Sequence, residues 1–299
     1  MDKFLGIDIG AEKTHIGIGN QNGLESDAHV IDTASYWSEK ELVELARKKI
    51  DELGYSEEDI NSIGIGASAV VDKKQKEVEQ PVLLDKISFQ PVEEELGIPV
   101  HVDADCNTAV IAEKMFGDGK EKKNLVTLTM SGGVGAGVYF DNQLLSFSRR
   151  MPVAGHIMLD YKEGKVWEDI FSGIKYNNFL IQKIKGSTKT ALNTSIRDKD
   201  ITLEHVKKKA EEGDKIAQEY LEDVAYINSV GIANIANAYS PELITFRGYM
   251  AENNPEIMKE SFEQVKYHTV TPTPEMKLTE VENIGIKGAI GLAIKENKK

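Results

Sequence analysis

The chain has 299 residues, of which 40% are hydrophobic and 28% charged, and 36 Lys and Arg against 49 Asp and Glu give a net charge of −13. This length predicts two domains of roughly 150 residues with real cores, which excludes disordered, collagen-like and mini-protein chains. The negative charge disfavours nucleic-acid and anionic membrane partners. The single cysteine, Cys106, excludes an internal disulfide and a multi-thiolate zinc or iron–sulfur site.

The N-terminal segment has no basic stretch followed by a long apolar run, so we expect no signal peptide. No apolar window of about 18 residues occurs, so we expect no membrane-spanning helix. Together with the cysteine count, these features predict a cytoplasmic protein.

The first strong pattern is an apolar strand, a glycine-bearing turn and a second strand rich in glycine and β-branched residues. The strands are expected at Phe4–Ile9 and Thr14–Gly19, with a hairpin turn at Asn20–Gly23. The same pattern returns with strands at Leu125–Met130 and Gly135–Phe140. This repetition predicts two related α/β halves rather than one large sheet.

The segment between the two patterns alternates helices and strands. It predicts a helix at Glu39–Leu53, a strand at Ser62–Gly66, a loop through Pro81 and Pro91, a buried strand at Pro99–Val102 and a helix at Asn107–Phe116. We place the domain boundary at the end of that helix. The N-terminal domain is then residues 1–117 and the C-terminal domain residues 118–299.

Apolar residues at steps of three and four in the second half predict a long helix at Asp214–Ala238. A strand is expected at Leu243–Phe246, and a mobile surface loop at Lys185–Asp200. The last helix, residues 284–296, could pack back on the N-terminal domain.

The first turn carries Asp8, Gly10 and Lys13 at the end of a strand. A carboxylate, an unobstructed backbone and a cation in that order suit a metal–phosphate complex, although Asp and Gly are also ordinary turn formers. The second turn carries Gly132, Gly133, Gly135 and Gly137. These leave backbone N–H groups free to cradle phosphate oxygens, although glycines are also common in tight hairpins that bind nothing.

Asp105 lies where a buried strand ends and a helix begins, a place where side chains project toward a ligand. It is the candidate general base. Alternatively, Asp103 or Asp105 simply caps the helix. Glu113 on the same helix is better explained as structural.

These motifs resemble, in order and spacing, those of the ROK family of sugar kinases and sugar-responsive repressors, within the actin-like ATPase superfamily. DIGAEK at residues 8–13 resembles D-I-G-G-T-K, and GIGASAVVD at 64–72 resembles G-I-G-x-P-G-x-V-D. DADCNTAVIAE at 103–113 resembles N-D-A-N-A-A-A-L-G-E, and LTMSGGVGAG at 128–137 resembles L-T-L-G-T-G-I-G-G-G. The resemblance implies two actin-like (ribonuclease H-like) α/β domains with a cleft between them.

The resemblance continues toward the C-terminus and covers nearly the whole chain. Residues 154–157 resemble the end of G-E-I-G-H-M, residues 166–173 resemble C-L-E-x-Y-x-S-G, and residues 241–248 resemble P-E-x-I-V-I-G-G. Residues 284–294 look like the closing helix.

By this resemblance Asp105 is the catalytic base, and Asp8 holds Mg²⁺ through water. Asn107, His156 and Glu168 bind the sugar, although His156 could be an ordinary core or surface histidine and Glu168 could complement a helix dipole. The residues implied to bind ATP are Asp8, Gly10, Lys13, Ser131, Gly132, Gly133, Gly135 and Gly248.

Four positions depart from the family pattern. Glu12 stands in place of Thr beside the first turn, where its carboxylate repels phosphate unless a cation offsets it. Gly132 replaces a Thr hydroxyl, and Ala104 and Val153 replace an Asn and a Glu that contact sugar. The cysteine cluster that typically follows the family's His is absent, so no structural zinc is expected.

The sequence thus predicts an ATP- and Mg²⁺-dependent sugar kinase, glucokinase-like, acting on a hexose or amino sugar. One alternative is a catalytically impaired sugar or nucleotide sensor, and another is an ATPase with a non-sugar substrate. Only seven residues precede Asp8, too few for the helix-turn-helix of the repressor branch, so we expect no direct DNA binding. A homodimer is possible, because the helix at Asp214–Ala238 offers apolar area.

Overall fold

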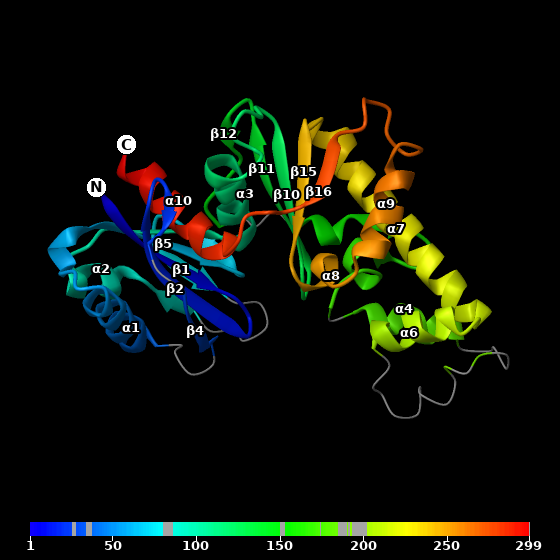
Figure 1. The fold of residues 1–299 in the computed structure, drawn as a ribbon, viewed down its shortest axis with the longest axis horizontal. Coiled ribbons are helices and arrows are strands. Elements are labelled where there is room, and N and C mark those ends of the chain that lie inside the picture. The colour runs from blue at the N-terminus through cyan, green and yellow to red at the C-terminus, as the bar shows by residue number, and fades with distance from the viewer. Residues whose placement is uncertain are drawn as a thin grey trace. The chain divides into compact units, whose positions relative to one another are not determined.

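The computed structural model describes residues 1–25, 28–33, 38–79, 86–149, 153–173, 175–184, 190, 192 and 202–298 (Figure 1). The chain forms two compact units. The first comprises residues 1–127, 136–152 and 279–299, and the second comprises residues 128–135 and 153–278. The chain therefore passes between the units several times, a course that a single boundary after residue 117 does not describe.

The first unit is built on a sheet in the order β3-β2-β1-β5-β9, with β4 paired to β2. β1 and β2 are antiparallel, as the first hairpin predicted, whereas β5 lies parallel to both β1 and β9. The strands are β1 (Lys3–Ile9), β2 (Lys13–Asn20), β3 (Gly23–Leu24), β4 (His29–Asp32), β5 (Ile60–Ala67) and β9 (Val100–Ala104).

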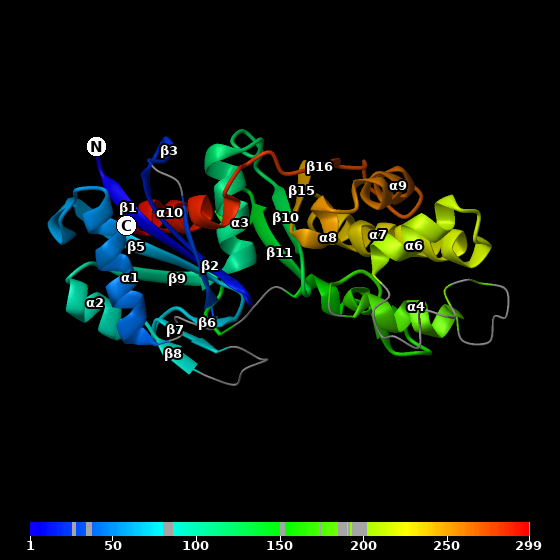
Figure 2. The same cartoon turned by 60° about the horizontal axis from the view of Figure 1, so that its bottom comes forward.

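Alternation along β1 sends successive side chains to opposite faces of this sheet. Leu5, Ile7 and Ile9 join the core under helices α1 (Glu39–Glu52) and α2 (Gln90–Leu96). Phe4 packs on the other face against α10 (Ile284–Asn297). Figure 2 shows α1 and α10 on the two sides of the sheet.

Glycines allow α10 to lie close to the sheet. A Cβ at Gly6 would lie 2.8 Å from the Ile286 carbonyl oxygen, and one at Gly64 would lie 1.9 Å from that of Ala289. Helix α3 (Asp105–Phe116) contacts α10 on the same face. The last helix therefore packs on the N-terminal strands.

A small antiparallel sheet completes the first unit in the described residues. It consists of β6 (Val70–Asp72), β7 (Glu77–Glu79) and β8 (Lys86–Ser88). A one-turn 3₁₀ helix, Glu57–Asp59, precedes β5. Pro81 of the predicted loop lies outside the described residues.

A second sheet has the order β12-β11-β10-β15-β16. Its hairpin, β10 and β11, contributes residues to both units, and β15 and β16 are parallel. The strands are β10 (Leu125–Met130), β11 (Val134–Phe140), β12 (Gln143–Leu144), β15 (Leu243–Arg247) and β16 (Glu275–Leu278).

The second unit contains α7 (Lys215–Tyr239), the long helix that the sequence predicted. Phe246 of β15 packs on Phe262 of α9 with ring centroids 4.7 Å apart. The other described elements are α4 (Tyr176–Ile184), α6 (Leu203–Glu211), α8 (Tyr249–Glu252), α9 (Pro255–Val265), β13 (Met158–Asp160), β14 (Lys165–Val166) and two 3₁₀ turns, Ala154–His156 and Trp167–Asp169.

Trp167 anchors the last of these turns. It is fully buried, its Nε1 donates to Asn228 Oδ1 at 2.9 Å, and a Cβ at Gly231 would lie 2.3 Å from its ring. The packing of Trp167 against α7 therefore fixes the position of Glu168, the next residue.

Apart from Thr190 and Leu192, the predicted loop at Lys185–Asp200 lies outside the described residues. Searching the described helices for one long and apolar enough to cross a bilayer finds none.

Candidate active site

Asp8 occupies the end of β1, where the register places His15 of β2 on one side and Gly66 of β5 on the other. It is 8% exposed, and its Oδ2 lies 3.9 Å from His15 Nδ1. A Cβ at Gly285 would lie 1.8 Å from Asp8 Oδ2, so the carboxylate sits against the first turn of α10. The unpaired N–H groups and positive dipole end of that turn favour a negative charge here.

The first glycine turn closes on itself between β1 and β2. Gly10 N donates to Lys13 O at 3.0 Å, and Thr33 Oγ1 donates to Gly10 O at 2.9 Å. The Lys13 ammonium group forms an ion pair with Asp32, and the two side chains are 54% and 65% exposed. Such an exposed pair contributes only about 0–1 kcal/mol, so a phosphate could compete for the lysine.

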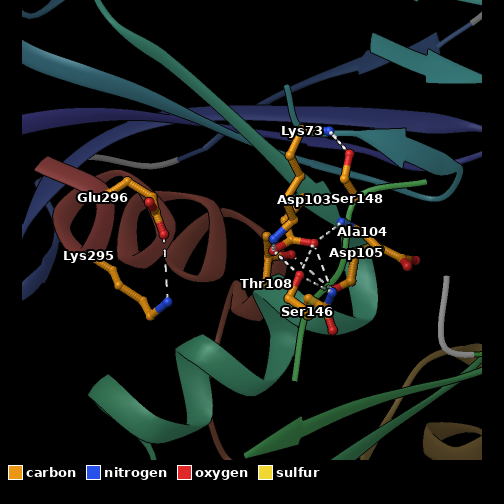
Figure 3. Close-up of polar contacts among 10 residues, drawn as sticks. Lys73, Asp103, Ala104, Asp105, Thr108, Ser146, Ser148, Lys295 and Glu296 are labelled. Atoms are coloured by element: carbon orange, nitrogen blue, oxygen red, sulfur yellow. Dashed lines mark hydrogen bonds and ion pairs between the residues drawn. The ribbon is translucent and has the colours of Figure 1, made fainter. Parts of the chain in front are cut away.

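Asp103, at the end of β9, is the centre of a buried polar network (Figure 3). Its carboxylate pairs with Lys73 and accepts hydrogen bonds from Ser146 Oγ at 2.9 and 3.0 Å and from Asn107 Nδ2 at 2.8 Å. Asn107 is 1% exposed and also donates to Ser146 at 3.0 Å. The Asn107 Nδ2 group is thus engaged inside the first unit, whereas Asn107 Oδ1 is buried without a hydrogen-bond partner among the described residues.

Asp105 is the first residue of α3 and is half-buried. Its Oδ1 accepts from Cys106 N at 2.7 Å, and Thr108 Oγ1 donates to the Asp105 carbonyl oxygen at 2.9 Å. The N-cap residue is Ala104, and no side chain caps the helix. Neither aspartate therefore serves as the N-cap. Burial together with the two nearby carboxylates raises the pKa of the Cys106 thiol well above its usual value, which disfavours the reactive thiolate.

A second carboxylate of the first unit, Asp72, continues this network. It accepts from Ser148 Oγ at 2.9 Å and pairs with Arg149, whose hydrogen bond holds the pKa of the Asp72 carboxyl well below its usual range. Lys73 N donates to Ser148 Oγ at 3.1 Å. No sequence pattern indicated these partners, because Ser146 and Ser148 lie 43 or more residues from the aspartates they contact.

The second glycine turn is held by chain far away in sequence. Ser131 N donates to Gly133 O at 3.0 Å, Gly173 N donates to Ser131 O at 2.7 Å, and Tyr249 N donates to Ser131 Oγ at 3.3 Å. Gly248 has φ of 100°, and a Cβ there would lie 2.6 Å from both Met130 O and Ser131 Oγ.

Exposure along this turn differs from residue to residue. Ser131 and Gly132 are exposed, whereas Gly135 is buried within β11. The contacts of Gly248 and Tyr249 with Ser131 bring Ser131, Gly132, Gly133 and Gly248 together.

Two predicted sugar ligands also meet in the second unit. His156 Nε2 lies 3.2 Å from Glu168 Oε1, and the Glu168 side chain is 11% exposed. A Cβ at Gly155 would lie 2.5 Å from Glu168 Oε2, and one at Gly133 would lie 3.0 Å from it. This carboxylate therefore borders the second glycine turn, and a side chain at position 155 would displace it.

Lys175 completes this group, and sequence reasoning missed it. Its Nζ donates to Glu168 Oε1 at 2.9 Å and lies 3.3 Å from Asp169 Oδ1. The hydrogen bond to Glu168 raises the pKa of the Lys175 ammonium group. The available sequence signal was its position, two residues after Ser172-Gly173, the S-G pair that ends the motif at residues 166–173.

The sequence model of the ROK family matches residues 4–296. A glucokinase from Streptomyces coelicolor is 23% identical, over 86% of this chain and 85% of that protein. A xylose repressor from Caldicellulosiruptor bescii is 24% identical over 81% of this chain, but the match spans only 64% of the repressor.

Solved structures show the same fold. A ROK hexokinase from Thermus thermophilus superposes with a TM-score of 0.81 at 21% identity, covering 99% of each chain. A ROK family glucokinase from Streptomyces griseus, in complex with glucose and AMPPNP, superposes with a TM-score of 0.74 at 22% identity, covering 98% of this chain and 99% of that one.

Proposed function

The chain belongs to the ROK family, and from that premise we propose that it is an ATP-dependent sugar kinase. It transfers the γ-phosphoryl group to a hydroxyl of a hexose or amino sugar. One observation carries this proposal: Glu168, held by Lys175 beside His156, directly borders the glycine turn at Ser131–Gly133. A sugar-binding carboxylate and a phosphate-binding turn in contact suit transfer between the two ligands.

Mg²⁺ fits this chain at Asp8. The ion usually binds one or two protein carboxylates, with waters and substrate phosphates completing its shell. Asp8 is nine-tenths buried, and its carboxylate lies against the first turn of α10. When bound, Mg²⁺ would neutralise charge on the phosphates of ATP.

The chain's own residues supply the remaining steps. Asp105 takes the proton of the sugar hydroxyl as that oxygen attacks the γ-phosphorus, and the bond from phosphorus to the ADP oxygen breaks. The Asp103 network fixes the end of β9 from which α3 and Asp105 start. Backbone N–H groups of the second glycine turn stabilise the charge that develops on the phosphoryl group.

Replacing Asp105 by Asn tests the proposal. We expect turnover, measured as ADP release over a panel of hexoses and amino sugars, to fall by about 10²–10⁴-fold. ATP affinity and Tm should remain unchanged, because Asn keeps the size of the side chain. Asp51→Asn, on the exposed surface of α1, removes the same charge as a control. Normal turnover in Asp105→Asn would remove Asp105 from the mechanism.

A sugar-binding protein without kinase turnover is the second candidate. The specific observation in its favour is Val153, which is 39% exposed at a position where the family motif carries a sugar-binding Glu. Repressors also occur among the relatives. A wild-type protein that binds sugars, yet releases ADP with none of them, would favour this candidate over the kinase.

A further inference from the structure

Lys73, the residue that follows β6, reaches the carboxylate of Asp103 near the end of β9 (Figure 3). The Asp103 side chain is 2% exposed, whereas the Lys73 side chain is 29% exposed. A carboxylate buried this deeply requires an opposite charge and several hydrogen bonds to replace its hydration. Without the Lys73 ammonium group, the donors that the structure gives to Asp103 are the neutral groups of Ser146, Asn107 and Ala104.

The Asp103 carboxylate holds the first turn of α3 at two points. Its Oδ1 accepts from Ala104 N at 2.8 Å and from Asn107 Nδ2 at 2.8 Å. Ala104 is the N-cap of α3, and Asn107 is the third residue of the helix. Asp105 lies between these two contacts, so one carboxylate fixes the chain on both sides of it.

The orientation of the Asp105 side chain depends on this turn. Its Oδ1 accepts from Cys106 N at 2.7 Å, which ties the carboxylate to the backbone of the first turn. The first N–H groups of a helix have no partner within the helix, and no side chain at the N-cap of α3 accepts from them. A change in the hold of Asp103 on Ala104 and Asn107 would therefore also move the Asp105 carboxylate.

We propose that Lys73 is a positioning residue, which acts through Asp103 to fix the first turn of α3 and, with it, the Asp105 side chain. The role of Asp105 as a base rests on the proposed kinase function, whereas the link from Lys73 to Asp105 does not. A general base must lie within hydrogen-bond distance of the proton that it removes. A displacement of about 1 Å can lower the rate of a reaction about 100-fold.

Steady-state kinetics of Lys73 variants tests the proposal. For Lys73→Met we expect kcat to fall roughly 10- to 100-fold, while the KM for ATP is unchanged. Lys73→Arg keeps the charge and should restore most of the loss. Lys73→Gln retains a neutral donor for Asp103, should give an intermediate kcat, and provides the test if Lys73→Met folds poorly. A kcat equal to that of the wild type in the Met variant, or in the Gln variant in its place, would overturn the proposal.

Lys76→Met is the matched control. Lys76 lies three residues further along the same turn, pairs with Glu93 in the first unit, and has a side chain that is 26% exposed. Its replacement removes the same charge from a similar depth, so kcat should stay at the wild-type value. An equal loss of kcat in the two Met variants would overturn the proposal, because the effect would then belong to the whole turn.

A double-mutant cycle with Asp105→Asn shows whether Lys73 acts through Asp105. Lys73→Met should lower the kcat of the Asp105→Asn enzyme by less than about threefold, because residues that act as a unit have non-additive effects. If the two losses multiply in full, Lys73 serves the reaction by another route and the proposal is wrong.

Amide hydrogen exchange measured by NMR tests the link without any enzymatic activity. In Lys73→Met we expect the Cys106 amide proton to exchange at least about tenfold faster relative to the amides of the β1–β2 hairpin, which report on the unit as a whole. Unchanged relative exchange would overturn the positioning role, whether or not the protein is a kinase. A wild type that phosphorylates no sugar would refute the kinase alone, and the exchange rates would then decide the role of Lys73.

Discussion

The two glycine turns share a sequence pattern but are held in different ways. The turn at Gly10–Lys13 closes locally, through Gly10 N and Lys13 O, with Thr33 beneath it. The turn at Ser131–Gly133 also closes locally, through Ser131 N and Gly133 O, but it is held in addition by Gly173 N and by Tyr249 N, which is more than 100 residues away. The motif therefore specifies the turn, while distant segments of the chain specify which further contacts hold it.

The charges around the two turns differ as well. The cation of the first turn, Lys13, is exposed and paired with an exposed carboxylate. Next to the second turn, Lys175 holds a carboxylate that is almost buried. We expect substitutions near the second turn to have the larger effects, because buried charges and close backbone contacts are harder to replace.

The largest contrast should come from alanine at the two glycines. Gly248→Ala forces a Cβ to 2.6 Å from two oxygens at a φ of 100°, and should lower the free energy of unfolding by about 3 kcal/mol or more. Gly10→Ala meets a single carbonyl oxygen at 2.9 Å, and should cost roughly 1 kcal/mol. Urea denaturation of both variants measures the difference. Equal losses would mean that the second turn is no more tightly held than the first.

A smaller effect, confined to sugar binding, is expected for Lys175→Met. Without its ammonium group the almost buried Glu168 loses a charged partner and its fixed position, so the sugar KM should rise about tenfold, or roughly 1.4 kcal/mol. The KM for ATP should not change, and Lys175→Arg should restore most of the loss. Steady-state kinetics with each substrate varied in turn provides the measurement. A parallel rise in both KM values would assign Lys175 a merely structural role.

The smallest effect is expected at the first turn. Asp32→Asn releases Lys13 from its exposed ion pair and should tighten ATP binding about two- to fivefold at low salt, since such pairs contribute at most about 1 kcal/mol. The gain should shrink at high salt, because exposed charges are screened. Titration of ATP at two ionic strengths measures it. Weaker ATP binding in this variant would show that Asp32 helps to position Lys13.

Much of the local structure was predictable from the sequence. The strand at Leu125–Met130 has the predicted bounds, and the helices at Glu39–Glu52 and Lys215–Tyr239 differ by one residue from prediction at their ends. These elements carry strong periodic patterns and clear turn residues. Helix α3 begins at Asp105, two residues before the predicted start, because the strand ends in an uncapped turn that has no sequence signature.

The candidate site was predictable only in part. His156 and Glu168, twelve residues apart, were singled out from motifs, and the structure brings them within 3.2 Å. The assignments of Asp8 and Asp105 remain predictions, and Asp105→Asn tests the second of them. Lys175 escaped notice because a lysine after a turn is ordinary in sequence, and its importance comes from the carboxylate it contacts.

The sequence by itself determined the periodic elements, the two glycine turns and the family, because these depend on residues that are neighbours along the chain or on their order. Tertiary structure alone decided which charges are paired. It joined Lys73 and Ser146 to Asp103, and it joined Lys175 to Glu168. Charge pairing depends on distances and burial that the folded chain creates, and those distances carry the functional proposals.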